Sequence, residues 1–240
     1  MDNLEALANA WPRIVDGVLV TLQLTVGGAA LALVVAVTLG LAARQENILA
    51  RGAARVVVEF FRGTSLLVQL FWLFYVLPLM GIRLESLLTG IIALGLNYGA
   101  YGAEVVRGSI NAVPKGQWEV ATALSLSPFH RMRRIIWPQA WAIMIPSLTN
   151  LLVMLLKGTA VASVILLQDL TYVTEQLRRG TGDTFFSYGV GMIIYFLIAL
   201  ALVLVANLVE RHAKHRLGTA PPLRESFRLR KPVRTTAEVG

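Results

Sequence analysis

The chain has 240 residues, of which 56% are hydrophobic and only 15% are charged. Its long uncharged apolar runs leave no polar face for water, so an ordinary soluble domain is excluded and an all-α, polytopic membrane protein is predicted. The absence of cysteine excludes disulfides and thiolate chemistry. The formal net charge of +8 is gathered beside the apolar runs, where membrane topology and anionic lipid explain it without nucleic acid.

Five stretches of the chain are apolar enough and long enough to cross a membrane. A helix needs about 20 apolar residues to span the hydrocarbon core. On this criterion the predicted transmembrane helices are 18–43, 56–80, 86–106, 139–167 and 186–209. The residues before the first helix lack the basic region and the cleavage site of a secretory signal, so no cleaved peptide is expected.

The distribution of Lys and Arg predicts the orientation of these helices, because cytoplasmic loops near membrane ends carry the excess of both residues. With the N-terminus outside and the C-terminus cytoplasmic, four of them fall in outer segments and fifteen in cytoplasmic segments: three in 44–55, four in 115–134 and eight in 211–234. The expected organisation is an extracytoplasmic segment 1–16, a membrane domain 17–209 and a basic cytoplasmic tail 210–240 that is predicted to be disordered.

The connection 107–138 is the most informative part of the chain, since about 30 residues is long for a link between helices. A short helix is predicted over 117–126, and Ser127 with Pro128 has the N-cap and first-turn chemistry of a second one. An apolar set in the first helix is expected to be exposed on the cytoplasmic side and to bind a partner, because the chain alone offers nothing to bury it. The set is Trp118, Val120, Ala121 and Leu124.

This connection resembles the cytoplasmic loop of ABC import permeases. The family pattern is Glu-Ala-Ala, three residues, Gly, nine residues, Ile, one residue and Leu-Pro. The chain matches it at Glu119, Ala121, Ile135 and Pro138, and departs from it at Val120, Ser125 and Trp137. Serine is a tolerable substitute at the glycine position where the backbone does not require a positive φ.

Three further segments resemble polar amino-acid permeases of this EAA-loop, type I family. The segment 60–78 is similar to their second-helix motif, 99–119 to the exit of their third helix, and 155–165 to their Leu-Lys-x-Thr-Ser-Leu stretch, with departures at Gly158 and Ala160. The resemblance covers 17–209. Within the family, the runs 65–78 and 93–110 look closest to permeases for ectoine and hydroxyectoine, and general polar amino-acid uptake is the competing assignment.

The resemblance implies a permease subunit of a binding-protein-dependent ABC importer in the bacterial inner membrane, which is a transport protein and not an enzyme. The chain has no Walker A pattern and no expected cofactor, so ATP must be hydrolysed by another polypeptide. The implied partners are two ATP-binding cassette subunits, a second and paralogous permease, and an extracytoplasmic solute-binding protein. The residues expected to form the ATPase-docking loop are Gly116, Trp118, Glu119, Ala121, Leu124, Ser125, Ile135 and Pro138.

Ionisable groups inside membrane segments are costly, so each needs a partner or a wet pathway. Glu104 and Arg107 are three residues apart on one helix and are expected to form an ion pair. Arg62 is expected to lie close enough to the cytoplasmic interface to snorkel towards it. A substrate pathway for a zwitterionic solute is predicted from polar residues of three helices: Gln69, Asn97, Lys157, Thr159 and Arg62.

Other classes of protein fit the sequence less well. His130, His212 and His215 lie among basic residues and not in a ligand constellation with carboxylates, so no metal site is expected. A secondary transporter for a small zwitterionic solute should show two related halves with broken helices, and no such repeat is visible. A membrane enzyme should show a cluster of His, Asp or Cys near one face. A membrane scaffold subunit remains as an alternative.

Overall fold

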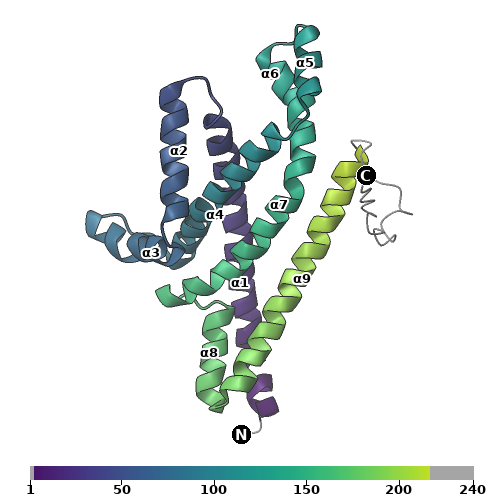
Figure 1. Ribbon diagram of the computed structural model, residues 1–240. Helices are drawn as coiled ribbons and strands as arrows, with labels where there is room; N and C mark the ends of the chain where they lie inside the picture. The colour runs from purple at the N-terminus through teal and green to yellow at the C-terminus, as the bar shows by residue number, and fades with distance from the viewer. Residues whose placement is uncertain (1–2, 217–240) are drawn as a thin grey trace, which may run out of the picture.

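The computed structural model describes residues 3–216, with side chains up to Arg211, and folds them into helices only, which confirms the all-α prediction (Figure 1). Of the tail 210–240, predicted to be disordered, residues 210–216 instead continue the last helix, and the rest lies outside this range. The α-helices are α1 Asn3–Ala42, α2 Ile48–Gly63, α3 Leu66–Phe71, α4 Ser86–Asn111, α5 Lys115–Ala123, α6 Pro128–Arg131, α7 Trp137–Gly158, α8 Leu170–Thr181 and α9 Thr184–Arg216. Trp72–Val76 and Met132–Ile136 are π-helical, and Leu77–Met80 and Thr159–Ile165 are 3-10 helical.

The centre of the bundle is the contact between α1 and α4, which run close together over most of their length. Glycines make this approach possible. A Cβ atom added to Gly99 of α4 would lie 2.7 Å from the Cβ of Val35 in α1, and one added to Gly40 of α1 would lie 2.9 Å from the carbonyl oxygen of Ala103. Close backbone contact through small residues is how membrane helices associate, because lipid provides no hydrophobic drive between them.

The helix α4 coincides with the third predicted span but is less apolar than the others. Among the described residues, three helices have the length and apolarity to cross a membrane, α1, the α6–α7 segment and α9, or four if α2 and the segment after it count as one bent span. The helix α4 packs against α1, α2, α3 and α7. A helix enclosed by protein does not need a lipid-compatible surface, which explains its glycines and its Asn97.

The second predicted span is not one straight helix. The sequence indicated a single helix over 56–80, but α2 begins earlier, at Ile48, and the segment Leu66–Met80 turns away from it by 100°. Gly63, Thr64 and Ser65 form the break, where Thr64 is in an extended conformation. Hydropathy could not reveal this break, because apolar residues continue on both sides of it.

The sequence also gave no indication of α8. Asp169 caps its first turn by accepting a hydrogen bond from the backbone N–H of Tyr172 at 3.0 Å, and Gly182, with a φ of 69°, ends it. Arg178 hydrogen-bonds to Glu175 and, with Tyr188 and Arg179, holds the pKa of that carboxylate far below its usual value. This short polar helix was missed because a search for long apolar runs passes over it.

The two ends of the bundle carry different elements. The α1–α2 turn, α5 and α6 lie at one end, and the C-terminal part of α9 points towards the same end (Figure 1). The N-terminal residues of α1, α8 and the α8–α9 turn lie at the opposite end. We call these the α5 end and the α8 end. The segments predicted to be cytoplasmic thus share one end of the molecule.

Candidate functional site

The helix α5 projects past the long helices of the bundle, where a partner could reach it (Figure 1). The helix α4 ends at Asn111, and Pro114 precedes α5 in an extended conformation with φ −52° and ψ 137°. The following helix starts at Pro128, where the Ser127 hydroxyl accepts a hydrogen bond from the backbone N–H of His130, as predicted for an N-cap. This second helix continues through a π-helical turn into α7 instead of standing alone.

Two members of the apolar set in α5 face the bundle, contrary to the expectation that all four are exposed. Ala121 is fully buried, and Trp118 is half-buried against the hydrophobic cluster around Ile110 and Ile136. Residues three apart share one helix face, so burying one of this pair buries the other. Val120 and Leu124 remain 57% and 64% exposed on the outer side. Only part of α5 therefore offers a surface to a partner.

The indole ring of Trp118 makes cation–π contacts with two guanidinium groups from different elements. Arg44 of the α1–α2 turn lies 5.7 Å from its centroid and Arg131 of α6 lies 5.5 Å from it. Arg131 also donates a hydrogen bond to the Thr122 hydroxyl at 3.1 Å, and Arg44 donates one to the side chain of Asn111. These contacts, which we call the Trp118 clamp, hold α5 to the α1–α2 turn and to α6. The sequence could not reveal the clamp, because Arg44 is far from α5 along the chain.

Ser125 occupies the glycine position of the family pattern and does adopt a positive φ, of 54°. The condition under which serine was expected to be tolerable is therefore not met. The turn is closed by hydrogen bonds from the Ser125 N–H to the Thr122 carbonyl and from the Leu126 N–H to the Ala121 carbonyl. A non-glycine residue in the left-handed conformation costs roughly 1–2 kcal/mol, so Ser125 destabilises this turn relative to glycine.

The remaining residues of the predicted docking loop differ in their exposure to solvent. Glu119 and Gly116 are exposed on α5. Ile135 packs against the same hydrophobic cluster as Trp118, and Pro138 lies half-buried in the first turn of α7. The exposed part of the predicted loop is thus concentrated on the outer side of α5, and its C-terminal part supports the bundle.

Gln69 and Asn97, predicted to line a substrate pathway, instead bind the backbone at the break after α2. The Gln69 side-chain amide donates to the Phe61 carbonyl at 2.9 Å and to the Thr64 hydroxyl at 2.6 Å. The Asn97 amide donates to the same Phe61 carbonyl at 3.0 Å and to the Gln69 carbonyl oxygen at 3.3 Å. Carbonyls released by a broken membrane helix must find partners within the protein. These two amides are the partners.

Lys157 and Thr159 lie elsewhere, so the predicted pathway residues do not converge. Lys157 is exposed and lines a cavity of about 590 Å³ between α7 and α9, to which Tyr195 also contributes. Thr159 is fully buried and donates its hydroxyl to the Leu156 carbonyl at 2.7 Å. Lys157 therefore remains a candidate for contact with a solute. The Thr159 hydroxyl is already occupied by its hydrogen bond to the Leu156 carbonyl.

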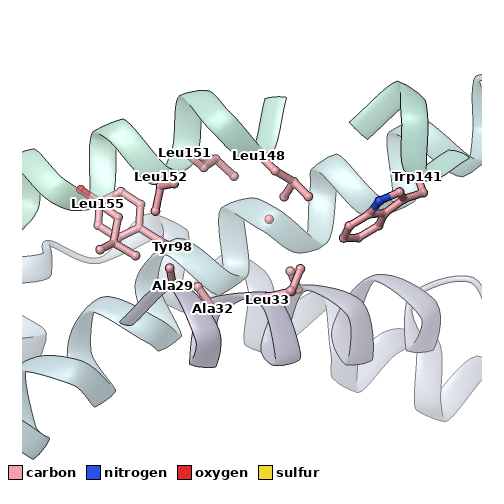
Figure 2. A pocket seen from close by; sticks show the side chains of 11 residues that line it. Ala29, Ala32, Leu33, Tyr98, Trp141, Leu148, Leu151, Leu152 and Leu155 are labelled. Carbon is pink, nitrogen blue, oxygen red and sulfur yellow. The ribbon is translucent and has the colours of Figure 1, made fainter. Parts of the chain in front are cut away.

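A second cavity, of about 220 Å³, lies between α1, α4 and α7 and is apolar (Figure 2). Leucines of α7 line one side of it, and Ala29, Ala32 and Leu33 of α1 line the other. The hydroxyl of Tyr98, at one end, already donates to the Met154 carbonyl at 2.9 Å. This cavity offers nothing that would bind a charged or zwitterionic solute.

Two ion pairs of the bundle lie within α2 and within α4. Arg107 and Glu104 form an ion pair at 2.5 Å, and Arg62 pairs with Glu59 at 3.2 Å. Arg62 lies in the last turn of α2, at the far end from the α1–α2 turn, and its expected position near a cytoplasmic interface stays a prediction. Because α2 starts at Ile48, Arg62 lies at the end of this helix and not near the start of a helix over 56–80.

Comparisons with known proteins agree with this architecture. Residues 35–218 match the family model described as "Binding-protein-dependent transport system inner membrane component". The chain is 42% identical over 200 residues to a probable amino-acid ABC transporter permease protein, y4tF, of Sinorhizobium fredii, covering 81% of this chain and 84% of the relative. The L-cystine transport system permease protein TcyB of Bacillus subtilis is 35% identical, covering 84% and 86%.

Solved structures share the fold. The crystal structure of an amino acid ABC transporter with histidines matches with a TM-score of 0.81 and 31% identity, covering 88% of this chain and 99% of the other. An inward-facing MetNI methionine ABC transporter matches with a TM-score of 0.72 at 18% identity, covering 84% and 96%, which shows likeness of fold alone. The chain belongs to the family of binding-protein-dependent transport system inner membrane components, the multi-pass permeases of ABC transporters, which are not enzymes.

Proposed function

We propose that the chain translocates a polar amino acid or an amino-acid-like solute inwards, and that ATP hydrolysed by a separate subunit drives it through α5. The relatives described as amino-acid and L-cystine permeases support this substrate class. The narrower prediction of ectoine rests on the runs 65–78 and 93–110, which form the segment after the break and α4. These runs carry Gln69 and Asn97, which stabilise the break, so their resemblance describes architecture more than substrate contact.

The outer side of α5 is the observation that carries the proposal. It combines an exposed carboxylate, Glu119, with the exposed apolar side chains of Val120 and Leu124 on a helix that the Trp118 clamp holds in place. A short helix with exposed apolar anchors suits a groove on a partner. The partner we propose is an ATP-binding cassette subunit, which supplies the phosphate-binding machinery that this chain lacks.

The rest of the proposed assembly follows from the family and from the two ends of the bundle. The α5 end faces the cytoplasm in accordance with the excess of Lys and Arg, and a solute-binding protein docks at the α8 end. Two ATP-binding subunits and two permeases complete the transporter. Two permease proteins of Sinorhizobium fredii, y4tF and y4tG, are 42% and 36% identical to this chain, which supports a paralogous second permease.

Replacing Glu119 by arginine is expected to abolish copurification of the ATP-binding subunit and uptake of the solute, because the new charge lies in the centre of the docking surface. The measurement is affinity purification of the tagged chain from membranes, followed by uptake into vesicles. Glu46→Arg is the matched control, since Glu46 is an exposed acid of the α1–α2 turn at the same end. Unimpaired association and uptake in the Glu119→Arg variant would refute docking through α5.

A further inference from the structure

The apolar cavity between α1, α4 and α7 is a groove that opens at the surface of the bundle. Leu33 on the α1 side is 40% exposed, and the α7 leucines opposite it are half-buried: Leu148, Leu151 and Leu152. Trp141 and Tyr98 lie at its two ends (Figure 2). The α1 side otherwise carries alanines, so little side-chain volume fills the space between the two helices. We call this feature the α1–α7 groove.

The charges of α1 determine the depth of the α1–α7 groove. The helix has the length and apolarity to cross a membrane, and no charged residue occurs between Asp16 and Arg44. A hydrocarbon core of about 30 Å takes about 20 helical residues, and a tilted helix takes more. The possible stretches run from 17–36 to 24–43, so every one of them contains residues 24–36 and with them Ala29, Ala32 and Leu33. The groove therefore lies within the hydrocarbon.

Two arginines lie beyond the Trp141 end of the groove. Arg133 and Arg134 are exposed in the π-helical turn that leads into α7. Trp141 follows Arg134 by seven residues, about 10 Å along the axis, a spacing that returns to one helix face and that the π-helical turn shifts by part of a turn. Arg133 lies 6.0 Å from the Phe129 ring. Within residues 3–211 neither guanidinium group forms an ion pair, so both are available to an anion.

The level of these arginines follows from the Trp118 clamp. Arg131 and Arg44 contact the same indole ring, so the turn that carries Arg133 begins at the level where the uncharged part of α1 ends. The hydrocarbon core ends between residues 36 and 43, within about 12 Å of Arg44 along the helix. A head-group layer of about 5–8 Å begins at that edge, so long arginine side chains at this level reach its phosphates.

We propose that the α1–α7 groove and the two arginines bind an anionic phospholipid, with its phosphate at Arg133 and Arg134 and one acyl chain in the groove. Basic residues beside an apolar crevice between membrane helices suit such a lipid, and the α5 end is predicted to face the cytoplasm, whose leaflet carries anionic lipid. The chain enters at Trp141 and runs towards Tyr98. The Tyr98 hydroxyl already donates to the Met154 carbonyl, so the chain meets no unpaired polar group there.

A helix of the second permease is a poorer occupant of the α1–α7 groove. The groove has a volume of about 220 Å³. A helix with its side chains is about 10–12 Å across, so a partner helix covers the groove without filling it. A single acyl chain is thin and flexible enough to enter the groove and to contact both walls.

The experiment titrates the purified full-length chain in detergent with dioleoyl phosphatidylglycerol or dioleoyl phosphatidylcholine and counts the bound lipids by native mass spectrometry. One phosphatidylglycerol is expected to bind in preference to phosphatidylcholine. Replacing Arg133 and Arg134 together by glutamine is expected to weaken this binding about tenfold, because each arginine attracts the anionic head group. The matched control replaces Arg51 and Arg55 of α2 by glutamine, which removes the same charge from the same end and leaves the groove untouched.

A second pair of variants tests the acyl chain. Ala32→Leu places a larger side chain in the groove and is expected to weaken the binding of phosphatidylglycerol about tenfold, since a buried chain of several methylene groups loses its contacts. Ala30→Leu makes the same change on an exposed position of α1 at the same depth and is expected to have no effect. Leu152→Phe fills the groove from α7 if Ala32→Leu does not fold.

Equal losses in the two arginine pairs would overturn the proposal, because they would reduce it to a general attraction between basic protein and anionic lipid. Unchanged binding in both Ala32→Leu and Leu152→Phe would overturn it as well, because the chain would then lie outside the groove. Copurification of the ATP-binding subunit is scored on the same variants. Loss of that subunit from the Arg133 and Arg134 variant, with lipid binding intact, would assign the two arginines to a protein contact and would contradict the lipid site.

Discussion

Replacing Gly99 by alanine is expected to destabilise the bundle, whereas replacing Gly108 by alanine on the same helix is expected to stabilise it. A Cβ at position 99 would lie 2.7 Å from the Cβ of Val35 and 3.1 Å from the Ala32 carbonyl oxygen, so α1 must move away from α4. Overpacking of this kind costs about 1–3 kcal/mol. A Cβ at position 108 meets no atom within 4 Å, so the gain in helix propensity, about 1 kcal/mol, is unopposed.

The measurement is the thermal unfolding midpoint of the purified chain in lipid nanodiscs. Because both substitutions add one methyl group to α4, their difference isolates the contact between α4 and α1. Gly95 extends the series, since a Cβ there would approach the side chain of Leu31 to 2.5 Å. Shifts of equal sign and size at positions 99 and 108 would show that α1 and α4 are not in close contact.

Replacing Trp118 by alanine is expected to uncouple ATP hydrolysis from transport without releasing the ATP-binding subunit. The variant keeps the outer side of α5 and the hydrogen bond from Arg131 to Thr122, but loses the two cation–π contacts of the Trp118 clamp. Each cation–π contact contributes roughly 0.5–2 kcal/mol, so a fall of about tenfold in solute transported per ATP is expected. Movement of the docked helix is then transmitted less completely to the α1–α2 turn and to α6.

The measurement is the ratio of solute uptake to ATP hydrolysis in proteoliposomes that contain the whole transporter. Trp118→Phe retains an aromatic face and is expected to recover much of the ratio, which a purely steric role of the side chain would not require. An unchanged ratio in Trp118→Ala, with the ATP-binding subunit still bound, would show that the clamp does not transmit the movement.

The sequence predicted the long helices well, because an apolar run of membrane length admits few other structures. The regions of α1, α4, α7 and α9 follow from such runs, although α1 begins as early as Asn3. The break after α2 was not found in this way, since residues 62–65 interrupt the apolar run too briefly to divide it. Gln69 and Asn97 looked like a polar lining for a solute, but in the structure they serve the carbonyl groups released by the break.

The docking loop was predicted from a residue pattern, which identifies residues but not the directions in which they point. The pattern located α5 correctly and could not show that Ala121 and Trp118 face the bundle. Their burial depends on Arg44, from the α1–α2 turn, and on the cluster around Ile136. Such contacts between distant segments are set by the fold. The positive φ of Ser125 was equally invisible, because serine carries no signal for it.

Photo-crosslinking from α5 tests the central claim most directly. A benzophenone amino acid placed at Val120, on the outer side of α5, is expected to form a covalent adduct with the ATP-binding subunit of the transporter. The same group at Glu46, in the α1–α2 turn, is expected to form little or none, although it is exposed at the same end. An adduct from position 46 and none from position 120 would contradict the account.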